Sequence, residues 1–213
     1  MGYDFLDIAA TPSVRAAQAA NGSRAMWERA GRERPSRRFT PEAAAFIAAR
    51  DSFYMATVSE SGWPYVQHRG GPPGFLKVLD DRTLGFADLR GNRQYISLGN
   101  AGANDRVALI LMDYPNRARL KIYARLEVRD LAADPALAAQ LVIPGERAHA
   151  ERAILLHLEA FDWNCPQHIT PRFTIAEVAA GVQSLRTRLA ALDAENAALR
   201  AALERVRDME APA

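Results

Sequence analysis

The sequence predicts a small, mainly antiparallel β-barrel with short flanking helices and a C-terminal helix. Apolar and polar residues alternate through most of residues 51–161, and the connections between the alternating segments are too short for repeated crossover helices. A three-and-four-residue spacing of apolar side chains takes over at residue 175. We therefore divide the chain into an N-terminal helical arm (1–50), a barrel (51–172) and a C-terminal helix (173–213).

The N-terminal arm carries helix signals separated by a polar loop. Residues 13–20 and 23–27 have the composition of short helices, and the basic segment 32–38 reads as a solvated loop. Thr40 precedes a proline and an acidic residue, the usual start of a helix, and predicts a helix over 40–49.

The barrel region contains seven short segments with strand character, joined by turns rich in Gly, Asp and Ser. Two short helices interrupt them, at 92–98 and 134–141. The expected strands are 53–58, 63–68, 75–79, 83–87, 106–112, 119–129 and 153–161.

The C-terminal helix has a strict heptad pattern, in which Asn196 places one amide in an a position. Charges at g and e agree with a parallel dimer: Arg188 can meet Asp193 of a second copy, and Glu195 can meet Arg200. We expect a parallel coiled coil; the alternative is a single amphipathic helix that folds back on the barrel. The a and d positions are Ile175, Val178, Val182, Leu185, Leu189, Leu192, Asn196, Leu199, Leu203 and Val206.

Composition and charge exclude several classes of protein. The chain has 213 residues, of which 49% are hydrophobic and 24% charged, as in an ordinary globular protein. Its net charge is +2, without a strongly basic segment, so no nucleic-acid-binding face is predicted. A DNA-binding leucine zipper would need a basic helix before the heptads. Residues 170–180 contain one basic residue, Arg172, so this class is excluded.

The few cysteines and histidines predict neither a disulfide framework nor a metal site. Cys165 is the only cysteine, and the four histidines are scattered. No apolar run reaches the roughly 18 residues of a membrane span, and the N-terminus lacks a basic segment followed by an apolar one. We expect a cytoplasmic protein without membrane partners.

Two glycine- and arginine-rich stretches, QHRGGPPGF and FADLRGNRQY, predict an anion site. Glycines let backbone amides approach a phosphate, and the guanidinium of Arg69 or Arg93 can bind two of its oxygens. With a helix over 92–98, Arg93 and Gln94 would lie in its first turn, where free amides add to anion affinity. The alternative is that Arg69, Arg90 and Arg93 are ordinary exposed charges.

The order of these motifs resembles the pyridoxamine 5'-phosphate oxidase-like, FMN-binding split-barrel family. The resemblance is carried by RGGPPGFLKVLDDRTLGFADLRGNRQYISLGNAGANDRVALILMD, followed by RLKIYARLEV. It implies an antiparallel, Greek-key-like split β-barrel with FMN as cofactor, bound at the two-fold interface of a homodimer. A homodimer also agrees with the parallel coiled coil, since both need a two-fold axis.

The resemblance also implies which residues hold the cofactor. Arg69 and Lys77 match basic residues near the flavin phosphate, Asn92 and Arg93 match a basic phosphate pair, and Arg119 stands where the family often has a glutamine near the flavin. The aromatic-small pair Phe86-Ala87 would pass along the flavin edge, and Trp163 and Arg172 would cover the cofactor from the second subunit. The complete predicted cofactor site is Arg69, Lys77, Phe86, Ala87, Asn92, Arg93, Gln94, Arg119, Trp163 and Arg172.

These features predict an FMN-dependent oxidoreductase with a small-molecule substrate that the sequence does not identify. The family's Arg-x-His substrate motif has no counterpart at Cys165-Pro166-Gln167-His168, so oxidation of pyridoxamine phosphate itself is not predicted. The alternatives are a non-enzymatic flavin-binding or sensor protein, and a deazaflavin or haem binder on the same fold. His68 and Cys165 are candidates for a part in the chemistry, but a structural histidine and a buried cysteine are the simpler interpretations.

Overall fold

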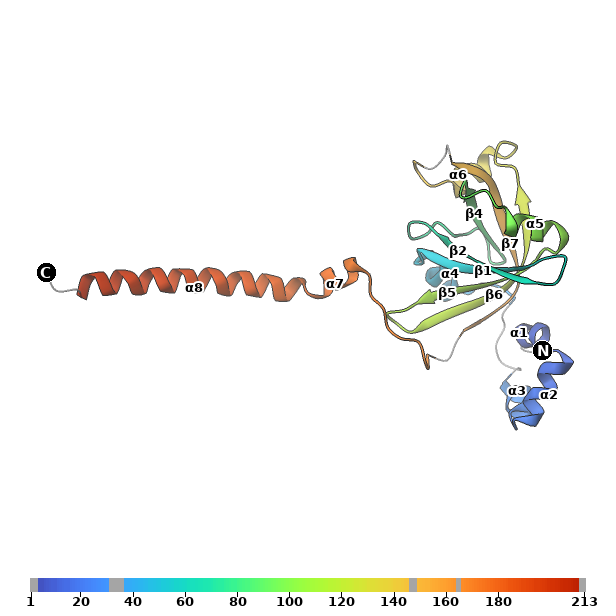
Figure 1. Cartoon of the computed structure of the whole chain (residues 1–213), viewed down its shortest axis with the longest axis horizontal. Coiled ribbons are helices and arrows are strands. Elements are labelled where there is room, and N and C mark those ends of the chain that lie inside the picture. Colours follow the sequence, from blue (N-terminus) through green and yellow to red (C-terminus); the bar gives the residue numbers. More distant parts are fainter. Residues whose placement is uncertain (1–3, 31–36, 146–148, 164–165, 211–213) are drawn as a thin grey trace. The chain divides into compact units, whose positions relative to one another are not determined.

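The computed structural model describes residues 4–30, 37–145, 149–163 and 166–210. The chain forms two compact units, Met1–Thr170 and Pro171–Ala213 (Figure 1). No helix in the described part of the chain is both long and apolar enough to cross a membrane.

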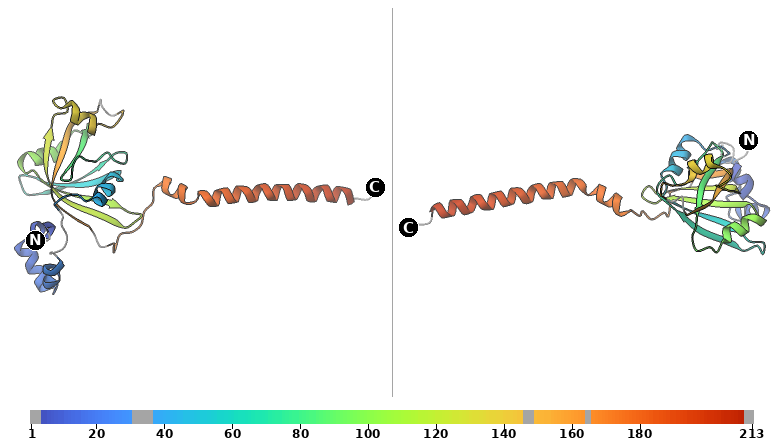
Figure 2. Two further views of the ribbon diagram at one scale, coloured as in Figure 1. Left: turned by 180° about the vertical axis from the view of Figure 1, so that it is seen from behind. Right: turned by 90° about the horizontal axis from the view of Figure 1, so that it is seen from above.

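The first unit is built on one seven-stranded antiparallel sheet that curls around a common core (Figure 2). The strand order is β2-β1-β5-β6-β7-β4-β3, so β2 and β3 are the ends of the hydrogen-bonded sheet. The predicted antiparallel split barrel is thereby confirmed. The strands are β1 (Ser52–Val58), β2 (Pro64–Gly70), β3 (Lys77–Val78), β4 (Thr83–Leu89), β5 (Arg106–Asp113), β6 (Ala118–Arg129) and β7 (Ala150–Trp163).

The barrel core is formed by alternate side chains of the strands, as the sequence pattern requires. Inward-facing residues of β1 and β5, such as Phe53 and Leu109, are 1% and 2% exposed, whereas Tyr54, which follows Phe53 and faces the outer side of β1, is 39% exposed. Helix α6 (Pro135–Leu141), capped by Asp134, adds Leu141 to a smaller cluster beside β4 and β7.

Helix α4 (Pro41–Ala48) is part of this core. Thr40 caps it by accepting a hydrogen bond from the amide of Ala43 at 3.2 Å, as the sequence predicted. Ala43 and Ile47 are fully buried in the main core cluster, together with Phe39. The hydrophobic core of the barrel therefore begins before residue 51, although this segment was predicted as part of an N-terminal arm.

The chain before α4 forms three further helices. Helices α2 (Pro12–Ala20) and α3 (Arg24–Ala30) match the predicted pair. Helix α1 (Asp4–Ala9), which has only six residues, was not predicted. Tertiary packing holds it: Phe5 stacks on Tyr123 of β6 with ring centroids 4.6 Å apart.

The predicted helix over 92–98 is wrong. Helix α5 runs from Ile96 to Ala103, so it both begins and ends later than predicted. Arg93 and Tyr95 have φ angles of 63° and 52°, in the left-handed region, so the right-handed helix cannot begin before residue 96. Residues 90–95 form a loop that joins β4 to α5.

The second unit contains two helices where one was predicted. Helix α7 (Ile175–Gly181) begins with a capping box between Thr174 and Glu177, and helix α8 (Gln183–Glu210) follows after a break at Val182. Gly181 explains the break, because glycine is among the weakest helix formers. Only α8 carries the heptad pattern on a continuous helix.

Gly71, directly after β2, is a position where a larger residue would not fit. An added Cβ would lie 2.7 Å from Cγ of Phe75, whose ring stacks on Phe53. We expect Gly71→Ala to lower the free energy of unfolding by about 1–3 kcal/mol, the usual cost of overpacking, in urea denaturation. Gly102→Ala, where no atom lies within 4 Å of the added carbon, should not lower stability; equal effects of the two substitutions would contradict this reading.

Candidate functional site

A polar cleft lies where β2, the end of β4, the 90–95 loop and the start of α5 meet. Its volume is about 210 Å³. It is lined by Tyr65, Gln67, Arg69, Asp88, Leu89, Gly91, Asn92, Arg93, Gln94, Tyr95, Ile96, Ser97 and Leu98. The two stretches that the sequence marked as an anion site therefore meet in one place.

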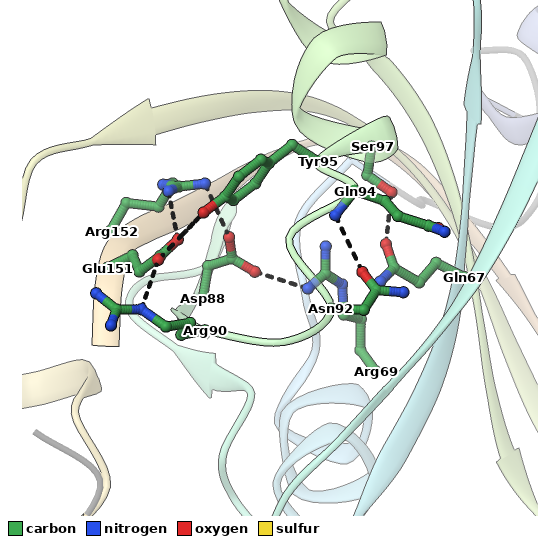
Figure 3. A network of polar contacts seen from close by, with 10 residues as sticks. All are labelled: Gln67, Arg69, Asp88, Arg90, Asn92, Gln94, Tyr95, Ser97, Glu151 and Arg152. Carbon is green, nitrogen blue, oxygen red and sulfur yellow. Dashed lines mark hydrogen bonds and ion pairs between the residues drawn. The ribbon is translucent and has the colours of Figure 1, made fainter. Parts of the chain in front are cut away.

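Strand β2 presents alternate side chains to this cleft. Tyr65, Gln67 and Arg69 face it, whereas Val66 and His68 point to the opposite side of the strand. Gln67 accepts a hydrogen bond from the hydroxyl of Ser97 on α5 at 2.8 Å (Figure 3). This bond ties the start of α5 to the edge strand.

Arg69 is bound to a carboxylate from the other part of the sheet. Its Nη1 donates to Oδ1 of Asp88 on β4 at 2.6 Å, and Arg152 on β7 donates to the other carboxylate oxygen at 3.4 Å (Figure 3). All three side chains are less than 20% exposed. The Nε of Arg69 is buried and has no hydrogen-bond partner among the described residues. Arg69 therefore retains donor capacity for a further acceptor.

A second carboxylate extends this network on the β7 side. Glu151 accepts hydrogen bonds from Arg90 at 3.1 Å and from the Tyr95 hydroxyl at 3.2 Å, and forms an ion pair with Arg152 at 2.6 Å (Figure 3). The bond from Arg90, with contributions from Tyr95 and Arg152, lowers the pKa of the Glu151 carboxyl. Glu151 is thus held as an anion that fixes the loop's arginine and tyrosine.

The 90–95 loop holds its shape through its own backbone. The side chain of Asn92 accepts a hydrogen bond from the amide of Gln94 at 3.1 Å, which makes an Asx-turn. Arg93 and Gln94 are exposed at the cleft, but they precede α5 rather than forming its first turn. The expected contribution of helix amides at these two positions is therefore wrong, and the role of the Arg93 side chain toward an anion stays a prediction.

The remaining predicted cofactor residues do not line this cleft. Lys77 is exposed on β3, and Phe86 and Ala87 are buried in the two core clusters. The guanidinium carbon of Arg69 lies 5.7 Å from the centre of the Phe86 ring, so Phe86 packs against the arginine that lines the cleft. Their roles toward a cofactor stay predictions.

Three further predicted residues lie elsewhere. Arg119 is half-buried on β6, opposite Met112. Trp163, at the end of β7, packs edge-on against Phe46 with ring centroids 4.9 Å apart. Arg172 belongs to the second unit. A role for these residues in covering a cofactor also stays a prediction.

His68, one of the two candidates for a part in the chemistry, does not line the cleft. His68 lies on the outer face of β2, where its ring contacts Tyr54 edge-on at 5.4 Å. Cys165 lies outside the described residues. Among the residues that the structure describes, no group of three or more His, Cys, Asp or Glu side chains could hold a metal ion.

Sequence reasoning missed Asp88, Glu151 and Arg152 as part of the site. Gln67 could have been found, because it stands two residues before Arg69 and a strand has a period of two. Asp88 and Arg152 are directly paired across β4 and β7. No local pattern of the sequence reveals that pairing, since 64 positions separate the two residues.

A second, mainly apolar hollow of about 550 Å³ lies on the outer face of β1, β5 and β6. A smaller hollow of about 260 Å³ adjoins it, and both are lined by Ala56, Ala108 and Tyr123. This outer face includes the exposed side chains of Tyr54 and Val66. It is an apolar surface on the side of the sheet opposite to Arg69.

Comparison with known proteins gives the family. The model of the family described as pyridoxamine 5'-phosphate oxidase matches residues 39–162, more than half of the chain. No curated protein matches the sequence. The matched segment starts at the buried Phe39 and ends within β7, so it takes in α4, six complete strands and nearly all of β7.

Solved structures with similar folds share little sequence with this chain. A protein from Lactobacillus delbrueckii, proposed to be a pyridoxamine 5'-phosphate oxidase, is 23% identical, with a TM-score of 0.46, covering 60% of this chain and 95% of its own. An FMN-binding protein from Syntrophomonas wolfei is 14% identical (TM-score 0.43; 72% and 95%). The haem storage protein HutZ from Vibrio cholerae is 19% identical (TM-score 0.42; 59% and 94%). On the match to the family model, the chain belongs to the pyridoxamine 5'-phosphate oxidase family.

Proposed function

We propose that this protein binds FMN, with the phosphate of the cofactor in the polar cleft, and acts as an oxidoreductase. The observation that carries the proposal is Arg69, whose buried Nε points to no partner among the described residues and which shares the cleft with Arg93. Membership of the family supports a flavin as the ligand.

The charges around the cleft fit a phosphate. Four arginines, at 69, 90, 93 and 152, outnumber the two carboxylates of Asp88 and Glu151. Arg152 can neutralise Asp88 when Arg69 turns to a ligand, because Arg152 already contacts the second carboxylate oxygen. An arginine fork can bind a phosphate through two parallel hydrogen bonds.

The size of the cleft supports a homodimer. At about 210 Å³ it is smaller than the roughly 300–1,000 Å³ of a pocket that encloses a drug-sized ligand. A phosphate and part of a ribityl chain would fill it, and the flavin ring would extend beyond it. We propose that a second copy of the chain completes the ring site, as the resemblance to the family implies.

In this proposal the protein's own residues bind the phosphate and orient the cofactor. Arg69 and Arg93 anchor the phosphate, Ser97 holds Gln67 in place at 2.8 Å, and Glu151 fixes the loop through Arg90 and Tyr95. When bound, FMN supplies the hydride or electron transfer. No side chain of the described cleft is assigned as an acid or a base.

Replacing the anchoring arginine should weaken binding of the phosphorylated cofactor selectively. We expect Arg69→Gln to raise the Kd for FMN at least about tenfold, because a charge-assisted hydrogen bond contributes roughly 1.5–3 kcal/mol. Titration of full-length apoprotein, followed by flavin fluorescence, measures this. Riboflavin, which has no phosphate, should bind wild type and variant alike.

Arg82→Gln is the matched control, since Arg82 is an exposed arginine on the turn between β3 and β4. An unchanged Kd for FMN in Arg69→Gln, or an equal loss for riboflavin, would contradict the phosphate assignment. Turnover of loaded protein with a reduced nicotinamide and an electron acceptor tests the enzyme assignment. Tight FMN binding without turnover would favour a flavin-binding or sensor protein, and a Soret band in purified protein would favour haem.

A further inference from the structure

We propose that helix α8 pairs with α8 of a second copy of the chain in a parallel two-stranded coiled coil, and that Asn196 sets this orientation. The proposal concerns the second unit alone and does not depend on the cofactor. It rests on the width of the apolar seam of α8, on the charges beside it and on the position of one amide.

The apolar seam of α8 has no partner among the described residues of its own unit. Its leucines are between 37% and 68% exposed, although each side chain is large and apolar. They recur with a strict seven-residue repeat. The apolar seam that results is narrower than the apolar stripe of a helix that packs on a globular core. The exposed leucines of the seam are Leu185, Leu189, Leu192, Leu199 and Leu203.

A second α8 is the partner that this narrow seam fits. The helix of 28 residues is about 42 Å long at 1.5 Å per residue, enough for several layers of side chains from two helices. From Leu185 to Leu203 the seam lies on one continuous helix. Identical helices present identical repeats, and every leucine then meets an equivalent one.

The charges beside the seam favour self-pairing but do not decide its direction. In a parallel pair, Arg188 meets Asp193 of the second copy, and Glu195 meets Arg200. In an antiparallel pair centred between positions 190 and 191, Arg188 would meet Glu195, and Arg186 would meet Asp193. Both arrangements bring opposite charges together.

Asn196 distinguishes the two directions. In the parallel pair its amide lies opposite the same amide of the second copy, and each can hydrogen-bond to the other. In the antiparallel pair that matches the charges, Asn196 would lie opposite Leu185, which offers no hydrogen bond to a buried amide. An amide buried without a partner is unfavourable, so the parallel two-stranded arrangement is preferred.

Disulfide crosslinking in the full-length protein tests the direction. In a Cys165→Ser background, Leu199→Cys places a thiol at a d position, which faces its own copy only in the parallel pair. We expect most of the chain to crosslink as a dimer under mild oxidation. Ala201→Cys, on the outer side of the same helix, is the matched control and should crosslink at least about tenfold more slowly.

Three results would overturn the proposal. The first is a monomer in light scattering, and the second is a Leu199→Cys crosslink that does not exceed the Ala201→Cys control. The third marks the antiparallel pair: a crosslink between Leu199→Cys and Val182→Cys chains that exceeds the one between two Leu199→Cys chains. Dimerisation through the barrel alone would leave a dimer in light scattering without the Leu199→Cys crosslink. Asn196→Leu should reduce the preference, with a loss of Leu199→Cys self-crosslinking or the appearance of larger assemblies.

Discussion

Asp88→Asn is expected to tighten the binding of FMN about tenfold or more, the opposite of the effect of Arg69→Gln. Asp88 holds Arg69 at 2.6 Å in the cleft, so a ligand phosphate must compete with its carboxylate. At an effective dielectric constant of about 20, two unit charges about 4 Å apart interact by about 4 kcal/mol. Asp88 and the phosphate are both negative and would both contact Arg69. Removing the charge of Asp88 therefore favours the FMN-bound state. Fluorescence titration of the full-length apoprotein measures the change in Kd.

The control for this prediction is Glu60→Gln, which changes the net charge equally but lies exposed in the turn between β1 and β2. It should leave the Kd for FMN unchanged. Weaker binding in Asp88→Asn would show instead that Asp88 positions Arg69 for the ligand. Because Arg152 also loses its contact, the urea denaturation curve of each variant should accompany the titration.

Ile47→Ala is expected to lower the free energy of unfolding by about 2–5 kcal/mol, the range for removing a buried isoleucine side chain from a core. Ile47 is fully buried in the main cluster, on a helix that precedes all the strands. Truncation would leave a cavity beneath α4 that the sheet cannot fill, because its strands are fixed by their hydrogen bonds. Urea denaturation followed by circular dichroism measures the change.

Ala45→Ser on the exposed side of α4 serves as control, with an expected change of no more than about 0.7 kcal/mol from helix propensity. If Ile47→Ala were as mild, α4 would be an attached helix rather than a part of the barrel core.

The alternation of apolar and polar residues was sufficient to predict the sheet. The start of α5 and the presence of α1 could not be predicted, because they depend on backbone conformation and on a tertiary contact. The pattern around Phe53 and Leu109 has a period of two, and the strands follow it. The start of α5 depends on left-handed backbone at Arg93 and Tyr95, which neither residue favours by itself. Helix α1 exists because Phe5 finds Tyr123, a contact far apart in the sequence.

The candidate site was predicted in part for the same reason. The arginines at 69 and 93 stand out as charges beside glycines, and the structure brings both to one cleft. The carboxylate partner of Arg69 could not be predicted, because Asp88 acquires its position from the pairing of β4 with β7. Sequence patterns indicated which charges are present but not which of them compensate one another.

The ion pair between Arg69 and Asp88 has a mechanical consequence. Strand β2 ends the sheet on one side, and β4 lies next to the opposite end, so no backbone ladder joins them. The contacts between these two parts of the sheet include this ion pair and the edge-on packing of Phe53 against Phe86. Ser97 and Asn100 of α5 also bond to Gln67 and Thr57. A ligand bound in this cleft would therefore add contacts between strands that no backbone hydrogen bonds connect.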